Sequence, residues 1–149
     1  MEEFPLSTKD AGEVLTLQRA AYVSEAQIYR DPFLPPLTQT LEELKRELSD
    51  GARGIGLRHE GRLVGAVRWV VEDGVARLAR LVVAPDLQGL GIGTRLLRSA
   101  EASSGVRAFE LFTGHRSVGN LRLYEREGYV EVRREVVSED LELVYLRKD

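Results

Sequence analysis

The sequence predicts a mixed α/β domain, with one open and mostly antiparallel sheet of six to seven strands and helices on both faces. Three observations lead to this prediction. The chain has 149 residues, which suits one domain with its own hydrophobic core. Hydrophobic residues make up 43% and charged residues 30%, as in soluble globular proteins. Helical and strand-like segments are mixed along the chain without a repeat or linker, so we treat residues 1–149 as a single domain.

The N-terminal third favours helices. Residues 8–22 carry apolar side chains at helical spacing. Residues 29–40 contain three prolines close together and predict a loop. Residues 40–48 predict a second, short helix, because Thr40 and Glu43 have the spacing of a capping box.

The middle of the chain changes to the two-residue period of strands. Residues 53–83 predict three strands joined by short turns at 59–62 and 71–74, where Gly61 and Gly74 can take positive φ. Short turns join antiparallel neighbours, so we expect a three-stranded meander.

The last third predicts two further helices and three strands. Residues 93–102 form a helix, and the strand at 108–114 could lie parallel to the preceding one because a helix separates them. Residues 117–128 form a helix that ends at Gly128, with Ser117 as its cap. Residues 129–149 form two closing strands.

Composition excludes several classes of site. The chain has no cysteine, which rules out disulfides and thiolate chemistry, and its two histidines lie too far apart in sequence to suggest zinc, so we expect no metal. No apolar run approaches the roughly 20 residues of a membrane helix, and the N-terminus lacks a signal core. We therefore expect a cytoplasmic protein without membrane contact. No basic stripe indicates a nucleic-acid partner.

The segment LVVAPDLQGLGIGTRLL (Leu81–Leu97) joins a strand to a helix through Gly89, Gly91 and Gly93. The first turn of a helix has unbonded N–H groups, and glycine lets a ligand approach the backbone closely. The N–H groups from Gln88 to Thr94 could thus hold a pyrophosphate. The alternative is a tight turn without a ligand. The spacing fits neither the dinucleotide fingerprint G-x-G-x-x-G nor the phosphate loop, which requires a lysine.

Two motifs resemble those of the GNAT N-acetyltransferase superfamily. The stretch VVAPDLQGLGIGTRLL is similar to its acyl-CoA signature Q/R-x-x-G-x-G/A, with Gln88, Gly91 and Gly93 at the fixed positions. The stretch GNLRLYEREGYVEV resembles the later motif, with Asn120 followed by Leu-Tyr-Glu and then by Gly with an aromatic residue. Both motifs occur in the order of the family, about 30 residues apart.

The resemblance implies a GNAT-like fold whose central strands splay apart at a coenzyme A slot. It also implies transfer of the acetyl group of acetyl-CoA to a primary amine of a small molecule or peptide, by direct attack in a ternary complex. Tyr124 would protonate the departing thiolate, Asn120 would bind the pantetheine arm, and an N–H near Val82 or Val83 would bind the thioester oxygen. The implied cofactor-binding residues are Leu81, Val82, Val83, Gln88, Gly89, Leu90, Gly91, Ile92, Gly93, Thr94 and Asn120.

The proton acceptor is less clear from the sequence. Many family members carry an acid in the strand before the glycine loop, but residues 75–83 contain none. Glu110 is the best in-strand carboxylate and is predicted to be catalytic; the alternative is that it pairs with an arginine such as Arg80 on the neighbouring strand. His115 is a weaker candidate. A site without a strong base would favour an α-amine, since its pKa of about 7.7–8.0 leaves roughly a tenth neutral at pH 7.

The acceptor side of the family corresponds here to residues 22–41. Residues 1–50 hold ten acidic and five basic side chains, which favours an amine-bearing acceptor over an anionic one. Two other functions stay open: a catalytically silent acyl-CoA sensor or interaction module, and a nucleotide-binding enzyme that uses the same loop. A homodimer through residues 141–149 is also possible.

Overall fold

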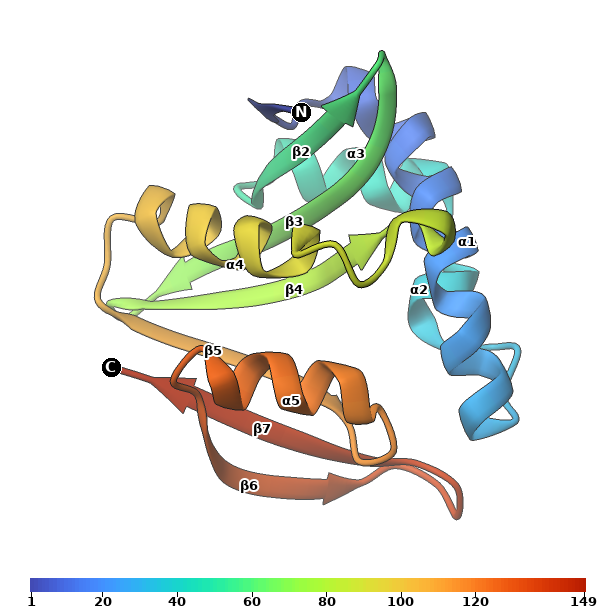
Figure 1. Ribbon diagram of the computed structural model, residues 1–149, viewed down its shortest axis with the longest axis vertical. Coiled ribbons are helices and arrows are strands. Elements are labelled where there is room, and N and C mark those ends of the chain that lie inside the picture. The colour runs from blue at the N-terminus through green and yellow to red at the C-terminus, as the bar shows by residue number, and fades with distance from the viewer.

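The computed structural model describes all 149 residues and shows one seven-stranded sheet with the strand order β1-β2-β3-β4-β5-β7-β6 (Figure 1). The strands are β1 (Glu2–Pro5), β2 (Arg53–His59), β3 (Arg62–Glu72), β4 (Val75–Val83), β5 (Ala108–Gly114), β6 (Val130–Val136) and β7 (Glu142–Lys148). The α-helices are α1 (Ala11–Tyr29), α2 (Pro35–Thr38), α3 (Leu41–Ser49), α4 (Ile92–Ser103) and α5 (Val118–Arg126), and two 3-10 helices are η1 (Thr8–Asp10) and η2 (Pro85–Leu87).

The sheet divides into two parts at β4 and β5. All other neighbouring strands pair antiparallel, as the short turns predicted. Strands β4 and β5 are parallel, and their pairing covers only Val75–Arg77 opposite Ala108–Glu110. Beyond Arg77 the two strands diverge, as Figure 1 shows. The predicted fold class, including the splayed central strands, is confirmed.

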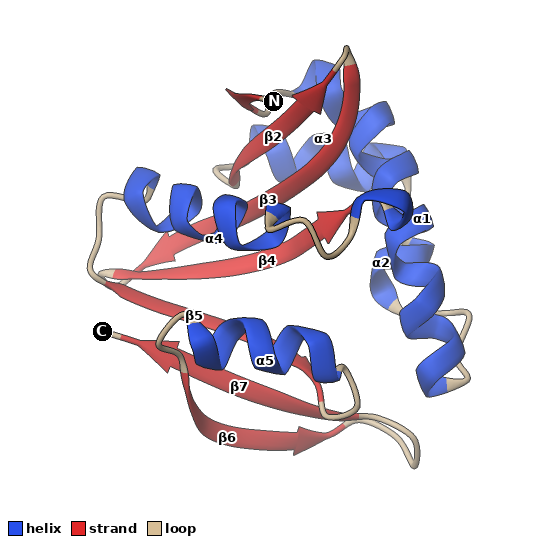
Figure 2. Cartoon of the chain, viewed as in Figure 1, coloured by secondary structure: helices blue, strands red, loops and turns tan.

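Helices cover both faces of the sheet, as β3 shows. A Cβ on Gly65 would lie 2.7 Å from the Leu96 side chain, so Gly65 lets α4 approach this face closely. On the opposite face Arg68 is buried, donates to Gln18 of α1 over 3.0 Å and pairs with Glu47 of α3. Figure 2 shows α4 and α5 on the side of the sheet that faces the viewer and α3 behind it.

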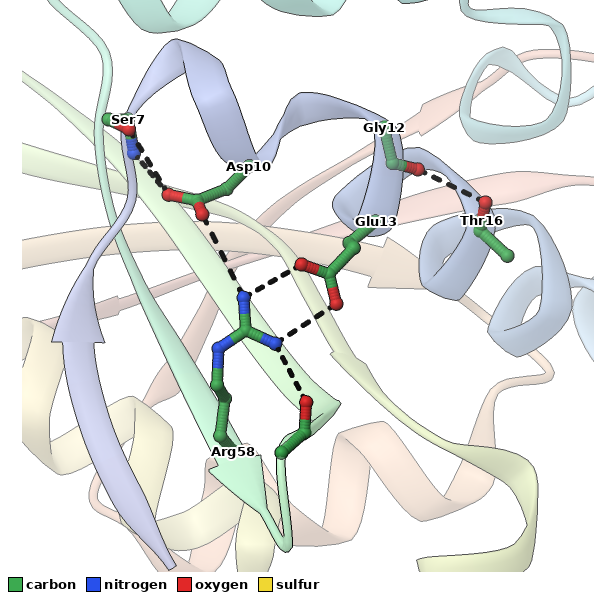
Figure 3. A network of polar contacts seen from close by, with 7 residues as sticks. Ser7, Asp10, Gly12, Glu13, Thr16 and Arg58 are labelled. Carbon is green, nitrogen blue, oxygen red and sulfur yellow. Dashed lines mark hydrogen bonds and ion pairs between the residues drawn. The ribbon is translucent and has the colours of Figure 1, made fainter.

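The start of α1 is attached to β2 by an arginine (Figure 3). Both terminal nitrogens of Arg58 bind the Glu13 carboxylate, at 2.7 and 3.0 Å, and Asp10 lies 3.9 Å from the same guanidinium. These hydrogen bonds hold the pKa of Glu13 below its usual value. The Ser7 and Asp10 side chains meanwhile close a capping box at η1. This cluster orients α1 as it leaves the sheet.

Several elements differ from the sequence prediction in extent. Strand β1 is present although it is short and ends in a proline, and residues 35–38 of the predicted loop form α2. Helix α1 continues past residue 22 to Tyr29 and ends where Arg30 takes a left-handed conformation with φ 54°. The capping box of Thr40 and Glu43 is confirmed.

The strand order limits how a dimer could form by strand pairing. Strand β7 lies between β5 and β6 and is hydrogen-bonded to both, so residues 141–149 offer no free strand edge. The two edge strands are β1 and β6, and β6 is exposed along its whole length. A dimer formed by strand pairing would therefore use β1 or β6.

Candidate active site

The glycine loop follows β4 and enters α4. Gly89 has φ 79°, and Gly91, at the N-cap of α4, has φ 81°. L-residues with a side chain are strained in this left-handed region, so both turns require glycine. Gly93 lies inside the helix and serves a different purpose, because a Cβ there would lie 3.4 Å from Leu123 of α5.

The backbone of this loop has an unbroken row of free donors. No N–H from Gln88 to Thr94 donates to a backbone or side-chain acceptor, and the first such bond on entering α4 runs from the Arg95 N–H to the Gly91 carbonyl over 3.1 Å. Free N–H groups at a helix start, together with the helix dipole, form an anion site. The loop thus has the row of free N–H groups that was expected from its three glycines.

A cavity of about 430 Å³ lies against this loop, and we call it the glycine-loop cavity. It is bordered by the loop, the end of β4, α1 and the start of α5. The predicted cofactor-binding residues that line it are Leu81, Val82, Val83, Gln88, Gly89, Gly91, Ile92, Gly93, Thr94 and Asn120. Leu90 does not line it and is 66% exposed. Arg126 also lines the cavity, whereas Arg95 pairs with Glu3.

The end of β4 presents main-chain groups to the gap beside β5. Ala84 donates its N–H to Val64 of β3 over 2.8 Å. Successive N–H groups of an extended strand point to opposite sides, so the N–H groups of Val83 and Leu81 point away from β3, toward the gap. The Gln88 side chain bonds the Val83 carbonyl there, at 3.4 Å. This part of β4 could pair with an extended ligand as with a further strand.

A second and more apolar cavity, of about 250 Å³, lies between the diverging strands, α1, α2 and the segment that joins β6 to β7. We call it the apolar cavity. The two cavities share Tyr22, Glu25, Leu81, Ser117 and Asn120 among their lining residues. They therefore meet at one place, beside the end of β4 and the start of α5.

Tyr124 lines the apolar cavity one helical turn after Asn120. Its side chain is buried, and this burial, followed by the influence of Tyr22 and Glu25, raises its pKa well above the usual value. The phenol therefore keeps its proton at neutral pH. Its hydroxyl makes no hydrogen bond within the chain, so that proton is free to be donated. The Asn120 amide is positioned by Thr113 of β5, at 3.2 Å.

A chain of hydrogen bonds leads to a carboxylate that the sequence prediction did not consider. The Arg116 N–H donates to the Tyr29 hydroxyl over 2.9 Å, and that hydroxyl lies 2.7 Å from the Ser117 hydroxyl. Ser117 in turn donates to Glu25 over 2.6 Å. Although Ser117 lies at the N-cap of α5, as predicted, its hydroxyl does not cap the helix but holds Glu25.

The sequence does contain a signal for Glu25. Tyr22, Glu25 and Tyr29 are spaced by three and four residues, which places them on one face of a helix. The predicted helix ended at Tyr22, so this spacing was not used. Gly114 completes the arrangement, because a Cβ there would lie 2.0 Å from the Tyr29 hydroxyl. Only glycine leaves room for that phenol.

Glu110 does not line either cavity. The sheet register places it between Arg77 of β4 and Arg147 of β7, and its carboxylate lies 3.6 Å and 3.0 Å from them. It pairs with these arginines rather than with Arg80. Glu110 thus forms ion pairs across three neighbouring strands and does not lie in the cavity that Tyr124 lines. His115 is also engaged, since its Nδ1 accepts the Glu142 N–H over 3.0 Å.

The structure has neither a cluster of metal-ligating side chains nor a helix that could span a membrane. No group of three or more His, Cys, Asp or Glu side chains is arranged to hold a metal ion. None of the helices has both the length and the apolar character needed to cross a membrane.

The comparison with protein families is consistent with this geometry. Residues 20–149 match the model of the acetyltransferase (GNAT) domain. The chain therefore belongs to the GNAT acetyltransferase family, and the predicted resemblance is confirmed. The acyl donor of this family is acetyl-CoA, the predicted co-substrate. The free N–H groups of the glycine loop and the adjoining cavity suit its pyrophosphate and its extended arm.

Individual relatives are distant in sequence. UPF0157 protein YqkA of Bacillus subtilis is 27% identical over 120 residues, which are 80% of this chain but 34% of that protein, so the chain spans about a third of its length. The ribosomal-protein-S18-alanine N-acetyltransferase of Escherichia coli has a TM-score of 0.81 at 17% identity, covering 99% of this chain and 92% of that one. The PaiA N-acetyltransferase of Thermoplasma acidophilum, solved with coenzyme A, has a TM-score of 0.72 at 18% identity, covering 97% and 98%.

Proposed function

We propose that this protein is an N-acetyltransferase that moves the acetyl group of acetyl-CoA to a primary amine by direct attack. The observation that supports this most strongly is the junction of the two cavities. The glycine-loop cavity suits the coenzyme, the apolar cavity is open to a second molecule, and the two share lining residues at one place. Such a junction lets both substrates be bound together, as direct transfer requires.

The residues around the junction have separate roles in this proposal. The N–H groups from Gln88 to Thr94 bind the pyrophosphate, and Asn120 binds the pantetheine arm. The Leu81 and Val83 N–H groups at the gap are placed to pair with that arm and to stabilise negative charge on the acyl oxygen. Among the residues predicted to bind the coenzyme, Leu90 has the weakest support because it points to solvent.

Acetyl-CoA supplies a thioester with an activated acyl carbon. In the proposed reaction the amine nitrogen forms a bond to that carbon while the carbon–sulfur bond breaks. Tyr124 holds a proton that can pass to the departing sulfur. Glu25, held by Ser117, is the carboxylate at the junction and is proposed to accept the proton that the amine loses, directly or through water. Glu25 takes this role in place of Glu110, which two arginines hold outside the cavities.

The first test combines binding and turnover. Calorimetry with acetyl-CoA should show binding at micromolar strength, and free thiol should appear only when a suitable amine is added. Binding without thiol release for every amine in a broad panel would instead support the acyl-CoA sensor. That alternative has one observation in its favour, the absence of an acid in β4. No binding of acetyl-CoA would contradict both functions.

A further inference from the structure

Arg80 has an unusual backbone for a residue within a strand. Its φ is 55°, whereas the other non-glycine residues with positive φ, Arg30, Glu60 and Asp73, lie at a helix end or in turns. The pairing of β3 with β4 shifts at this point, because Ala66 lies opposite Val82 while Arg68 lies opposite Ala79. Bulges of this kind turn a side chain in a new direction and are frequent beside active sites.

The side chain of Arg80 lines the apolar cavity but has no partner there. Its Nε is buried without any hydrogen bond, and no carboxylate forms an ion pair with its guanidinium. Arg68 on the neighbouring strand differs from Arg80, which is partly buried: Arg68 is fully buried and its charge is neutralised by Glu47. A buried polar atom without a partner is costly, and a buried cation usually has a counter-ion.

The cavity contains one further charged side chain. Among the residues that line it, only Arg80 and Glu25 are charged, and most of the others are hydrophobic. Apolar walls are supplied from opposite sides, by Leu34 and Pro36 near α2 and by Leu141 and Leu143 before and within β7. Glu25 and Arg80 do not pair with each other, so each remains available to a ligand group of opposite charge.

We propose that the acceptor is a free amino acid with an apolar side chain, whose carboxylate binds Arg80 while its amine lies at Glu25. This inference rests on the proposed acetyl transfer and names the acceptor class for it. A carboxylate would satisfy the buried Nε and neutralise the guanidinium, which presents donors in a fork that matches a carboxylate. A volume of about 250 Å³ suits a molecule of this size. A polyamine would leave Arg80 without a partner, and a peptide N-terminus has no carboxylate next to its amine.

The experiment compares two ligands with the same side chain, one with a carboxylate and one with an amide in its place. Rates are compared per neutral amine, because the amide also lowers the pKa of the amine beside it. L-Leucine and L-leucinamide are tested as acceptors by thiol release, with the wild type and with Arg80→Ala. The wild type should have a kcat/KM at least tenfold higher for leucine. Arg80→Ala should raise the KM for leucine about 10- to 100-fold, as expected for loss of hydrogen bonds to a charged group, and should change that for leucinamide less than twofold. Equal use of both acceptors by the wild type, or equal losses in the variant, would overturn the proposal.

Two controls separate this effect from others. Arg77→Ala removes an arginine of the same strand that pairs with Glu72 and Glu110 outside the cavity, and the KM for leucine should stay within twofold. Arg80→Lys keeps the charge without the fork and should recover part of the affinity. The affinity for acetyl-CoA should be the same in all these variants.

A binding measurement distinguishes failure of this inference from failure of the proposed function. N-Acetyl-L-leucine and its amide are titrated into the protein saturated with coenzyme A. If no amine is turned over but the acid binds at least tenfold more tightly than the amide, and Arg80→Ala abolishes the difference, the acetyl transfer is contradicted while Arg80 still recognises a carboxylate. If acid and amide bind equally, the inference is wrong whatever the turnover.

Discussion

Tyr124 shows what burial does to a candidate general acid. In water a phenol with a pKa near 10 is already protonated at neutral pH. Burial raises the pKa of Tyr124 further, which keeps the phenol protonated in the free protein but also makes it a weaker acid. The thiolate that leaves the acyl group develops in the same buried site, where its negative charge is costly as well, so it can take the proton. Because the hydroxyl has no partner within the chain, it can turn toward that sulfur without breaking another hydrogen bond.

Replacement of Tyr124 by phenylalanine tests this role. We expect Tyr124→Phe to lower kcat about 10²- to 10⁴-fold, the usual contribution of a general acid, while the dissociation constant of acetyl-CoA changes less than twofold. Stopped-flow detection of the thiol and calorimetry measure the two quantities. Since the side chain lies in the core, thermal unfolding serves as the control and should show a folded variant. An unchanged kcat would remove Tyr124 from the mechanism.

The same substitution, glutamate to glutamine, should have different effects on turnover at Glu25 and at Glu110. Glu25→Gln keeps the shape and the hydrogen bond from Ser117 but cannot accept a proton. We expect it to lower kcat/KM about 10²-fold at pH 7. Glu110→Gln should have less than a twofold effect, because its carboxylate pairs with Arg77 and Arg147 outside the cavities. If only Glu110→Gln impaired turnover, the assignment made from the sequence would be right and that of Glu25 wrong.

The pH dependence gives a second readout for Glu25. As pH rises toward the pKa of the amine, the neutral amine becomes more abundant, so the amine no longer has to lose a proton to the protein before it attacks. The rate of Glu25→Gln should therefore approach that of the wild type between pH 7 and pH 10. A purely structural role would leave the ratio of the two rates constant over this range. Initial rates at saturating acetyl-CoA measure this ratio.

At the scale of elements, the end of β5 and the helix α1 are linked through Gly114. Its missing side chain leaves room for the Tyr29 hydroxyl, which holds Ser117 and, through it, Glu25. We expect Gly114→Ala to displace Tyr29, to destabilise the fold by about 1–3 kcal/mol as overpacking does, and to lower kcat/KM at least tenfold. Urea unfolding and steady-state rates measure the two effects.

Gly12→Ala is the matched control for this substitution. A Cβ at Gly12 meets nothing within 4 Å, and the residue lies in helix α1 with ordinary φ and lines neither cavity. Alanine favours a helix over glycine, so stability should be unchanged or rise by up to about 1 kcal/mol. Gly114→Ala behaving like Gly12→Ala would show that Tyr29 can move without consequence for Glu25.

Comparison of the helices, strands and loops with the sequence prediction shows which features could be predicted. The meander, the helix after the glycine loop and the loop itself were predictable because local signals specify them: short turns, helical spacing and positive φ. The placement of Glu110 was not, because it depends on which residues of β4 and β7 lie opposite it, and register is a property of the whole sheet. The position of Glu25 could not be predicted for a related reason. Its carboxylate is held by Ser117, which is held by Tyr29, and Ser117 lies 92 residues further along the chain.

At the scale of the whole molecule, the sheet has two parts that share few main-chain bonds. The β1–β4 part and the β5–β7–β6 part are joined by the short parallel pairing of Val75–Arg77 with Ala108–Glu110. The glycine-loop cavity borders both, through the end of β4 on one side and the start of α5 on the other. A ligand in it therefore contacts both parts and should stabilise the molecule as a unit.

Coenzyme A binding should thus be visible in stability and in amide exchange together. At 100 times its dissociation constant the ligand adds about 2.7 kcal/mol to the free energy of unfolding, which corresponds to a rise in Tm of about 5–10 °C. Hydrogen exchange should slow most at the N–H groups from Gln88 to Thr94, because these have no acceptor in the free protein. The edge strand β6 contacts neither the loop nor the cavity and serves as the internal reference. A rise in Tm with protection spread evenly over all amides would show binding elsewhere, and the pyrophosphate site at the glycine loop would then be wrong.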